Sequence, residues 1–198
     1  MGEAPTGLQH VAWTGKGSLL YVPRTYRPTD PMPFALTLHG CCSEARGGLN
    51  LWYRYAKRRG IILLAPDGGG SWGSPELIDR GLREVFERYA VDPEHVAVVG
   101  FSAGASYSLT LGLANGHVFT HVVSHSPGGY SSAGAVGRPR VFLAHGTFDR
   151  TLPVRISRRL APQLRRRGYH VRYVEFRAGH RPQPEVMRMA VRWFLRKP

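Results

Sequence analysis

The sequence has very little cysteine, and its two cysteines, Cys41 and Cys42, are adjacent. Neighbouring cysteines rarely form an ordinary disulfide, because the geometry of the bridge needs a chain reversal between them. The chain also lacks the Cys-x-x-Cys and Cys/His spacings that hold zinc. We therefore expect no metal and no other cofactor. The absence of a disulfide framework favours a reducing, cytoplasmic location.

Long hydrophobic runs are missing as well. No apolar segment approaches the roughly 20 residues of a membrane-spanning helix. The first residues lack the basic and apolar regions of a secretory signal. With 198 residues, the chain has the usual length of one compact domain, which we expect to span residues 1–198.

Acidic residues and lysines are scarce. The chain has 27 basic and 13 acidic residues and a formal net charge of +14. Only Lys16, Lys57 and Lys197 are lysines, so the excess is arginine. Such a charge can bind nucleic acid, an anionic membrane or an anionic substrate. Because basic residues occur along the whole chain and the run at 165–167 falls in an amphipathic helix, we interpret the excess as solvated helix faces.

Short β-branched runs alternate with helical stretches. The expected strands are 18–22, 34–39, 61–65, 95–100, 118–124, 140–145 and 170–176, and the expected helices are 46–59, 75–89, 103–115, 155–167 and 183–196. Continuous apolar strands of this kind are typical of a mostly parallel sheet with helices on both faces. In such α/β sheets, functional residues gather at the carboxyl ends of the strands. No segment is long enough for a large lid.

The pattern Gly-x-Ser-x-Gly, which marks a nucleophile elbow, occurs at Ser102 and again at Ser71. Its glycines permit a tight strand-to-helix turn that exposes the serine hydroxyl. In a chain this rich in glycine the pattern alone proves little. Ser102 directly follows the strand HVAVVG and precedes small residues that begin a helix, whereas several loop residues separate Ser71 from its strand. The context therefore predicts Ser102 as the nucleophile.

A serine hydroxyl needs a general base and an acid that orients the base. Behind such an elbow the chain order is serine, acid, histidine. Asp149 is the only aspartate after Ser102, and it lies in a loop just past an expected strand. Glu175 lies inside a strand, and Glu185 follows the last histidine. We therefore predict Asp149 as the acid and His180, in the loop after the next strand, as the base.

Acyl transfer also needs donors for the negative charge that develops on the carbonyl oxygen. The backbone N–H of Ala103, directly after the nucleophile, is one expected donor. The second is expected from the loop after the strand FALTLH, from Cys41 or alternatively from Cys42. A catalytic thiol has no histidine partner in the pattern, so we interpret both cysteines as plain thiols.

The segments LHGCCS, GFSAGAS, HGTFDRTLPV and EFRAGH resemble the phospholipase/carboxylesterase branch of the α/β-hydrolases. They are also similar to polyhydroxybutyrate-depolymerase and feruloyl-esterase-like proteins. The resemblance implies a compact α/β-hydrolase fold, with Ser102, Asp149 and His180 as the triad and Cys41 and Ala103 as oxyanion donors. The export signal and the extended substrate-binding regions of the depolymerases have no counterpart, which favours a small soluble ester as substrate.

The expected function is a serine esterase that hydrolyses small carboxylic esters through an acyl-enzyme on Ser102. The alternatives are a thioesterase or lysophospholipase-like acyl hydrolase, because the same triad cleaves these bonds. From another class, a basic protein with a vestigial triad that binds nucleic acid or an anionic surface stays open. The first candidate for a substrate contact is Trp72, which lies in a loop after a central strand, and Phe101, Leu152 and Tyr130 are weaker candidates of the same kind.

Overall fold

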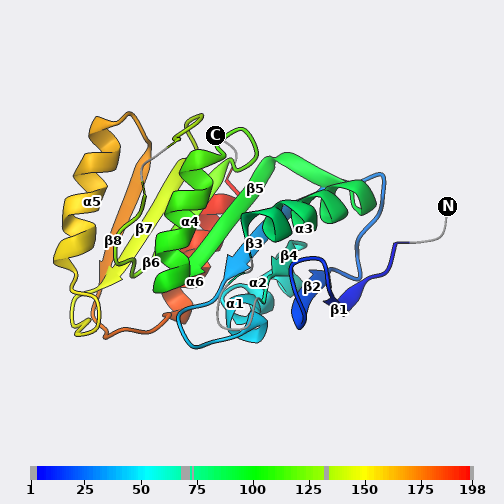
Figure 1. The fold of residues 1–198 in the computed structure, drawn as a ribbon, viewed down its shortest axis with the longest axis horizontal. Coiled ribbons are helices and arrows are strands. Elements are labelled where there is room, and N and C mark those ends of the chain that lie inside the picture. The colour runs from blue at the N-terminus through cyan, green and yellow to red at the C-terminus, as the bar shows by residue number, and fades with distance from the viewer. Residues whose placement is uncertain (1–3, 68–71, 73, 132–133, 197–198) are drawn as a thin grey trace.

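The computed structural model describes residues 4–67, 72, 74–131 and 134–196. These residues form one eight-stranded sheet in the order β1-β2-β4-β3-β5-β6-β7-β8 (Figure 1). The strands are β1 (Gly7–Val11), β2 (Ser18–Val22), β3 (Met32–Leu38), β4 (Ile62–Ala65), β5 (Val91–Phe101), β6 (His121–His125), β7 (Arg140–Gly146) and β8 (Val171–Phe176). From β4 to β8 all neighbours pair in parallel, whereas β2 pairs antiparallel with both β1 and β4.

Helices cover both faces of the sheet. They are α1 (Ala45–Asn50), α2 (Tyr53–Arg59), α3 (Pro75–Arg88), α4 (Ala103–Ala114), α5 (Arg155–Arg166) and α6 (Pro184–Phe194). The buried side chains of α3, α4 and α5 join one hydrophobic core, and those of α1, α2 and α6 join the other. Along β5 the side chains alternate between the two cores, with Val96 and Val98 in the first and Ala97 and Val99 in the second. The prediction of a mostly parallel sheet covered on both faces is confirmed.

Several predicted element bounds were wrong. Strand β1 was missed, because it lies at the sheet edge and none of its five residues is fully buried. The single helix expected over 46–59 is two helices that break before the fully buried Trp52, whose backbone is not helical (φ −126°, ψ −5°). Strand β5 begins at Val91, four residues earlier than expected.

The order of the strands fixes where the functional loops meet. From β3 the chain moves to β4 on one side, and from β4 it crosses to β5 on the other side of β3. The strand order therefore reverses between β3 and β5, and the loops that leave their carboxyl ends diverge there. Open α/β sheets bind their ligands at such a switch point. In this chain it lies between the loop that begins at His39 and the turn at Ser102.

Two histidines of β6 are buried in the sheet, His121 among Trp193 and Phe194 and His125 against Phe101. Burial lowers the pKa of each to about 3, with the charge of Arg140 adding to the effect at His121. Both are therefore neutral in the folded protein, whereas in the unfolded chain they take up protons below about pH 6.5. The contribution of these two neutral histidines to the free energy of unfolding is thus full above pH 6.5 and is lost as the pH falls toward 3.

We expect the free energy of unfolding, measured with urea, to drop between pH 7.5 and pH 5.0. The linkage relation gives about 2 kcal/mol per histidine at pH 5. The variant His121→Phe removes one titrating group from an aromatic environment, so its loss of stability between these pH values should be smaller than that of the wild type by about 2 kcal/mol. A dependence equal to that of the wild type would contradict the assignment to these histidines.

Candidate active site

Ser102 lies in a strained turn between β5 and α4. Its backbone has φ 57° and ψ −119°, a conformation that costs a non-glycine residue energy. The flanking glycines are required by close backbone contacts. A Cβ on Gly100 would lie 2.0 Å from the carbonyl oxygen of Gly104, and a Cβ on Gly104 would lie 2.4 Å from the carbonyl oxygens of Leu38 and His39. The glycines of the motif therefore let the turn close against β3.

The structure brings Ser102, His180 and Asp149 together. His180, in the loop after β8, places Nε2 2.8 Å from the Ser102 Oγ. Its Nδ1 lies 2.7 Å from Oδ2 of Asp149, which follows β7. Ser102 and Asp149 are buried, while the His180 side chain keeps 17% of its surface exposed. The three side chains form one continuous hydrogen-bonded chain at the carboxyl ends of β5, β7 and β8.

The surroundings of Asp149 keep its carboxyl group ionised. Burial by itself raises the pKa of this group, but hydrogen bonds from the Leu152 N–H, from His180 and from the Thr151 N–H outweigh burial and bring the pKa below its usual range. The two N–H groups donate to Oδ1 over 2.8 Å and 3.0 Å. Oδ2 is thus left for the imidazole. An ionised acceptor at Nδ1 fixes the proton of neutral His180 there and leaves Nε2 free to accept the Ser102 proton.

His145 is a residue of this site that the sequence analysis missed. It is fully buried, and its Nε2 donates to the carbonyl oxygen of Leu152 over 2.7 Å while Nδ1 accepts from the Ser157 hydroxyl over 2.7 Å. Burial lowers its pKa, so it stays neutral. Nε2 also lies 3.4 Å from Oδ2 of Asp149. His145 therefore fixes the loop that carries Asp149. Its place four residues before Asp149 was the available signal.

The loop after β3 lies against Ser102 from the other side. A Cβ on Gly40 would lie 3.2 Å from the Phe101 ring and 3.4 Å from the Cβ of Ser102, so the peptide that leads into Cys41 is next to Ser102. Ala103 is the first residue of α4, and its N–H has no acceptor within the helix. Cys41 and Cys42 are exposed free thiols, with their Sγ atoms 3.1 Å apart. Cys42 is left-handed, with φ 60°.

Comparison with known proteins decides the family. The profile of the phospholipase/carboxylesterase family matches residues 75–197, which is more than half of the chain. The chain belongs to this family. The fold and the family make it an esterase-type α/β-hydrolase and an enzyme. No match was found among curated proteins.

Solved structures of the same fold resemble this hydrolase over nearly its whole length. The esterase PE8 has a TM-score of 0.73 and 19% identity, with 95% of this chain and 98% of that chain covered. The S-formylglutathione hydrolase FrmB from Staphylococcus aureus has a TM-score of 0.75 and 13% identity, covering 96% and 97%. TT1662 from Thermus thermophilus has a TM-score of 0.74 and 20% identity, covering 98% and 100%.

The predicted substrate contacts of the hydrolase adjoin the candidate triad. The Trp72 indole N–H donates to the His39 carbonyl oxygen over 3.0 Å, and its ring stacks on Tyr107 with centroids 4.9 Å apart. The Phe101 ring lies 4.8 Å from the His180 imidazole. Leu152 supports Asp149 through its main chain. Each thus contacts a part of the site, and their role toward a substrate stays a prediction. Ser71 lies outside the described residues.

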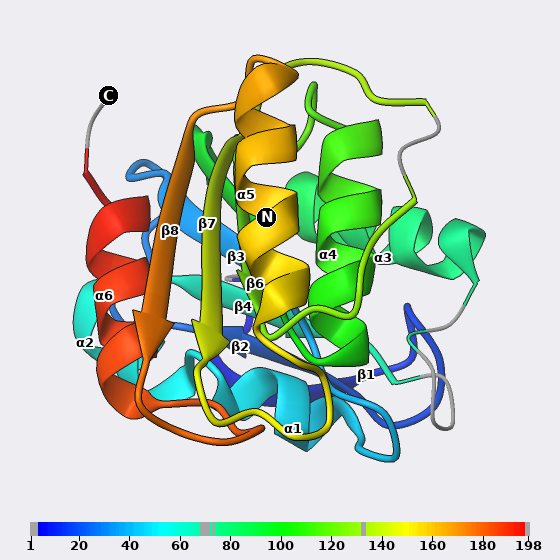
Figure 2. The ribbon, with the colours of Figure 1, turned by 90° about the vertical axis from the view of Figure 1, so that its left-hand side faces the viewer.

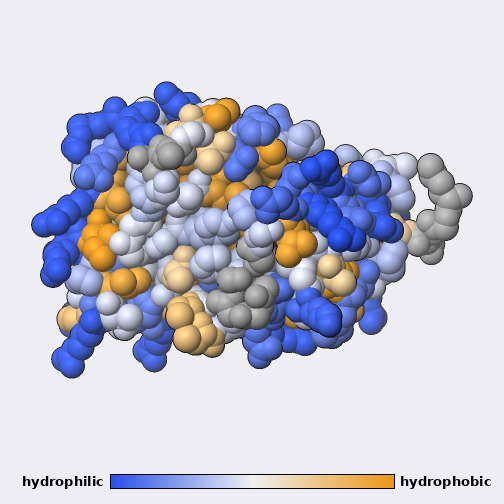
Figure 3. All heavy atoms as spheres, in the orientation of Figure 1, coloured by the Kyte–Doolittle hydropathy of each residue, from blue (hydrophilic) through white to orange (hydrophobic). Residues whose placement is uncertain are grey.

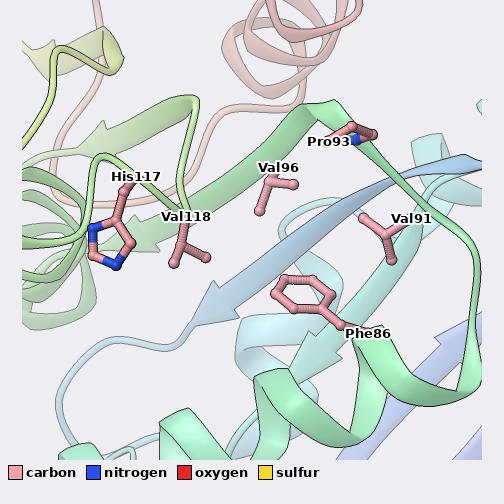
Figure 4. Close-up of a pocket in the computed structure, with 6 residues that line it drawn as sticks. All are labelled: Phe86, Val91, Pro93, Val96, His117 and Val118. Atoms are coloured by element: carbon pink, nitrogen blue, oxygen red, sulfur yellow. The ribbon is translucent and has the colours of Figure 1, made fainter.

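Other features of the described residues lie apart from this site. A pocket of about 300 Å³ is lined by Phe86, Val91, Pro93, Val96, His117 and Val118 (Figure 4). It adjoins the beginning of β5, whereas Ser102 follows the end of that strand. In the part of the chain that the structure describes, no group of three or more His, Cys, Asp or Glu side chains is placed to hold a metal ion. None of its helices is both long and apolar enough to cross a membrane.

Proposed function

We propose that this hydrolase is a serine esterase that cleaves small carboxylic esters through an acyl-enzyme on Ser102. The observation that carries the proposal is the continuous hydrogen-bonded chain from Asp149 through His180 to the Ser102 hydroxyl, with distances of 2.7 Å and 2.8 Å. A nucleophile, a base and an orienting acid in contact are the arrangement that acyl transfer requires.

In the first step, the Ser102 Oγ attacks the ester carbonyl carbon while its proton passes to Nε2 of His180. The resulting imidazolium is stabilised by the ionised Asp149 at Nδ1. The tetrahedral intermediate then collapses, the alcohol leaves with the proton from Nε2, and the acyl group stays on Oγ. In the second step a water molecule gives its proton to Nε2 and attacks the acyl group, and the carboxylic acid and free Ser102 result.

The oxyanion of each tetrahedral intermediate forms between the N-terminus of α4 and the loop at Gly40. We assign its donors to the N–H groups of Ala103 and Cys41. The N–H of Ala103 has no helical acceptor, and the peptide of Cys41 lies beside the nucleophile. Trp72 supports this arrangement, because its indole N–H ties the His39 carbonyl and so anchors the loop that presents Cys41.

The substrate class follows from the compact chain. The nucleophile is reached over loops from β3, β5, β7 and β8, and no long insertion over them was expected from the sequence. This favours short, soluble esters at an open site. A cytoplasmic location stays a prediction that rests on the two free thiols. The thioester alternative is kept in the substrate panel, since the same attack by Ser102 cleaves both bonds.

Trapping of the acyl-enzyme tests this function. Where deacylation is slower than acylation, we expect p-nitrophenyl butyrate to give a burst of p-nitrophenol of one equivalent per enzyme, and protein quenched in acid during turnover to carry a butyryl group on the peptide with Ser102. Ser102→Ala serves as the control and should give neither signal. Turnover of an ester and thioester panel by the wild type ranks the two classes. Steady turnover that persists in Ser102→Ala would overturn the proposal.

A further inference from the structure

Almost all of the net charge of the hydrolase lies in the last quarter of its sequence. Residues 150–198 contain thirteen arginines and one lysine against two glutamates, a net charge of +12. Residues 1–149 carry only +2 of the total of +14. A charge asymmetry of this size between parts of a chain indicates an interaction with a polyanion. The interpretation of the arginine excess as evenly solvated helix faces does not explain this concentration.

The fold gathers this segment on one side of the molecule. Strand β8 lies at one edge of the sheet, α5 packs beside it on one face, and α6 lies on the other face (Figure 2). Strongly hydrophilic side chains project from the α5 end of the molecule (Figure 3). We call the exposed side formed by α5, β8 and α6 the arginine face. Its exposed members include Arg155, Arg159 and Arg166 on α5, Arg172 on β8, and Arg188 and Arg192 on α6.

These guanidinium groups are mostly not neutralised by the protein itself. Among the described residues, the one salt bridge at the arginine face joins Arg158 to Glu175 over 2.7 Å. That pair holds the pKa of Glu175 down at about 2. The other glutamate of the segment, Glu185, has no ion pair within the described residues. Like charges that are not paired repel one another and destabilise the fold. Solubility alone therefore does not account for so many unpaired arginines on one face.

A groove runs along α6 within this face. It has a volume of about 350 Å³ and is lined by Arg172, Arg188, Arg192 and Arg196 together with Glu185 and the half-buried Met189. Arg188 and Arg192 lie one turn apart on α6, about 6 Å along its axis at 1.5 Å per residue, and Arg196 follows two residues after the helix ends. Phosphates of one nucleic-acid strand follow each other at about 3.4 Å along the axis. These arginines can therefore contact neighbouring phosphates of one strand.

We propose that the arginine face binds the phosphate backbone of nucleic acid, without reading its sequence, at a place separate from the ester site. Guanidinium groups bind phosphate in a bidentate manner, and the face is built from arginine rather than lysine. A membrane fits less well. The exposed large hydrophobic side chains of the described residues are Leu8, Phe86, Val136 and Phe148, and none of them belongs to α5, β8 or α6.

Binding of a fluorescent 20-base-pair duplex at several salt concentrations tests the proposal. We expect binding by the wild type that weakens linearly in a plot of log K against log [salt], and equal binding of a scrambled duplex. In the triple variant R188Q/R192Q/R196Q the slope should become shallower by about 2.7, since each lost contact with a B-DNA phosphate contributes about 0.9. Esterase turnover of the triple variant should equal that of the wild type, because none of the three residues contacts the triad.

The variant R58Q/R59Q/R80Q is the matched control, with the same change of net charge on exposed residues of α2 and α3. It should keep the slope of the wild type. An equal loss in both variants would overturn the arginine face as the site. Absence of duplex binding by the wild type at 50 mM salt would also overturn the proposal. So would binding to vesicles that contain phosphatidylglycerol together with no binding of the duplex, which would point to a membrane instead.

Discussion

Replacement of Ser102 by alanine should lower kcat for p-nitrophenyl butyrate by about 10⁶-fold, the size of loss found when a serine nucleophile is removed from a complete triad. Alanine cannot form the acyl-enzyme, and His180 loses the hydroxyl that lies 2.8 Å from its Nε2. The loss should fall on kcat, because the groups that would bind the rest of the ester are unchanged. Initial rates at saturating ester measure it, with enzyme prepared on fresh resin so that no wild type is carried over.

A matched variant separates the two serines that share the motif. Ser71→Ala should keep kcat within twofold of the wild type. Ser102→Ala should fold as the wild type does, since serine and alanine share the cost of the left-handed φ of 57° at this position. Circular dichroism and the urea midpoint check this. If Ser71→Ala lost activity and Ser102→Ala retained it, the assignment of the nucleophile would be reversed.

The strained turn at Ser102 was predictable from sequence because it depends on local chemistry. Gly100 and Gly104 leave no room for a Cβ, with backbone atoms at 2.0 Å and 2.4 Å from where it would lie. Only glycine satisfies such a steric requirement, so the requirement can be recognised from the two glycines in the sequence. The placement of Asp149 and His180 beside Ser102 was predictable for a different reason. Parallel strands bring their carboxyl ends to one edge, so residues just past β7 and β8 must lie near those past β5.

Contacts between distant segments were not predictable in this way. His145, near the end of β7, holds the loop of Asp149 through the Leu152 carbonyl and also contacts Ser157 of α5, and this packing is a tertiary feature that no periodicity reports. The break between α1 and α2 likewise depends on tertiary packing, since Trp52 is buried next to Phe194 from the other end of the chain. Strand β1 pairs only with β2 and buries little, so its apolar pattern is weak.

The concentration of arginine also has one part that the sequence shows and one part that only the fold shows. Its residue counts were present in the sequence, yet only the strand order shows that α5, β8 and α6 share one side of the molecule. A run of basic residues on one amphipathic helix is ordinary, and three neighbouring elements with the same charge are not. The assembly of the sheet therefore changes the interpretation of residues that, taken one helix at a time, need no explanation.

The second large effect is expected for Asp149→Asn, which should lower kcat by about 10⁴-fold, as replacement of the triad carboxylate does in serine proteases. The ionised Oδ2 now accepts the Nδ1 proton of His180 over 2.7 Å. An asparagine amide can place its NH₂ group there instead, which favours the imidazole tautomer with the proton on Nε2. That tautomer cannot accept the proton of Ser102. KM should change little, because Asp149 is buried and does not reach the substrate.

Glu175→Gln is the control for this variant, since it makes the same change from carboxylate to amide on the next strand. Glu175 pairs with Arg158 and with the hydroxyl of Tyr173 at the exposed edge of the sheet, away from Ser102. Its kcat should therefore equal that of the wild type. Comparison of kcat between the two variants, at equal stability, separates the effect of the carboxylate charge beside Nδ1 of His180 from the general effect of losing a carboxylate. An equal loss of kcat in both would show that Asp149 does not act through His180.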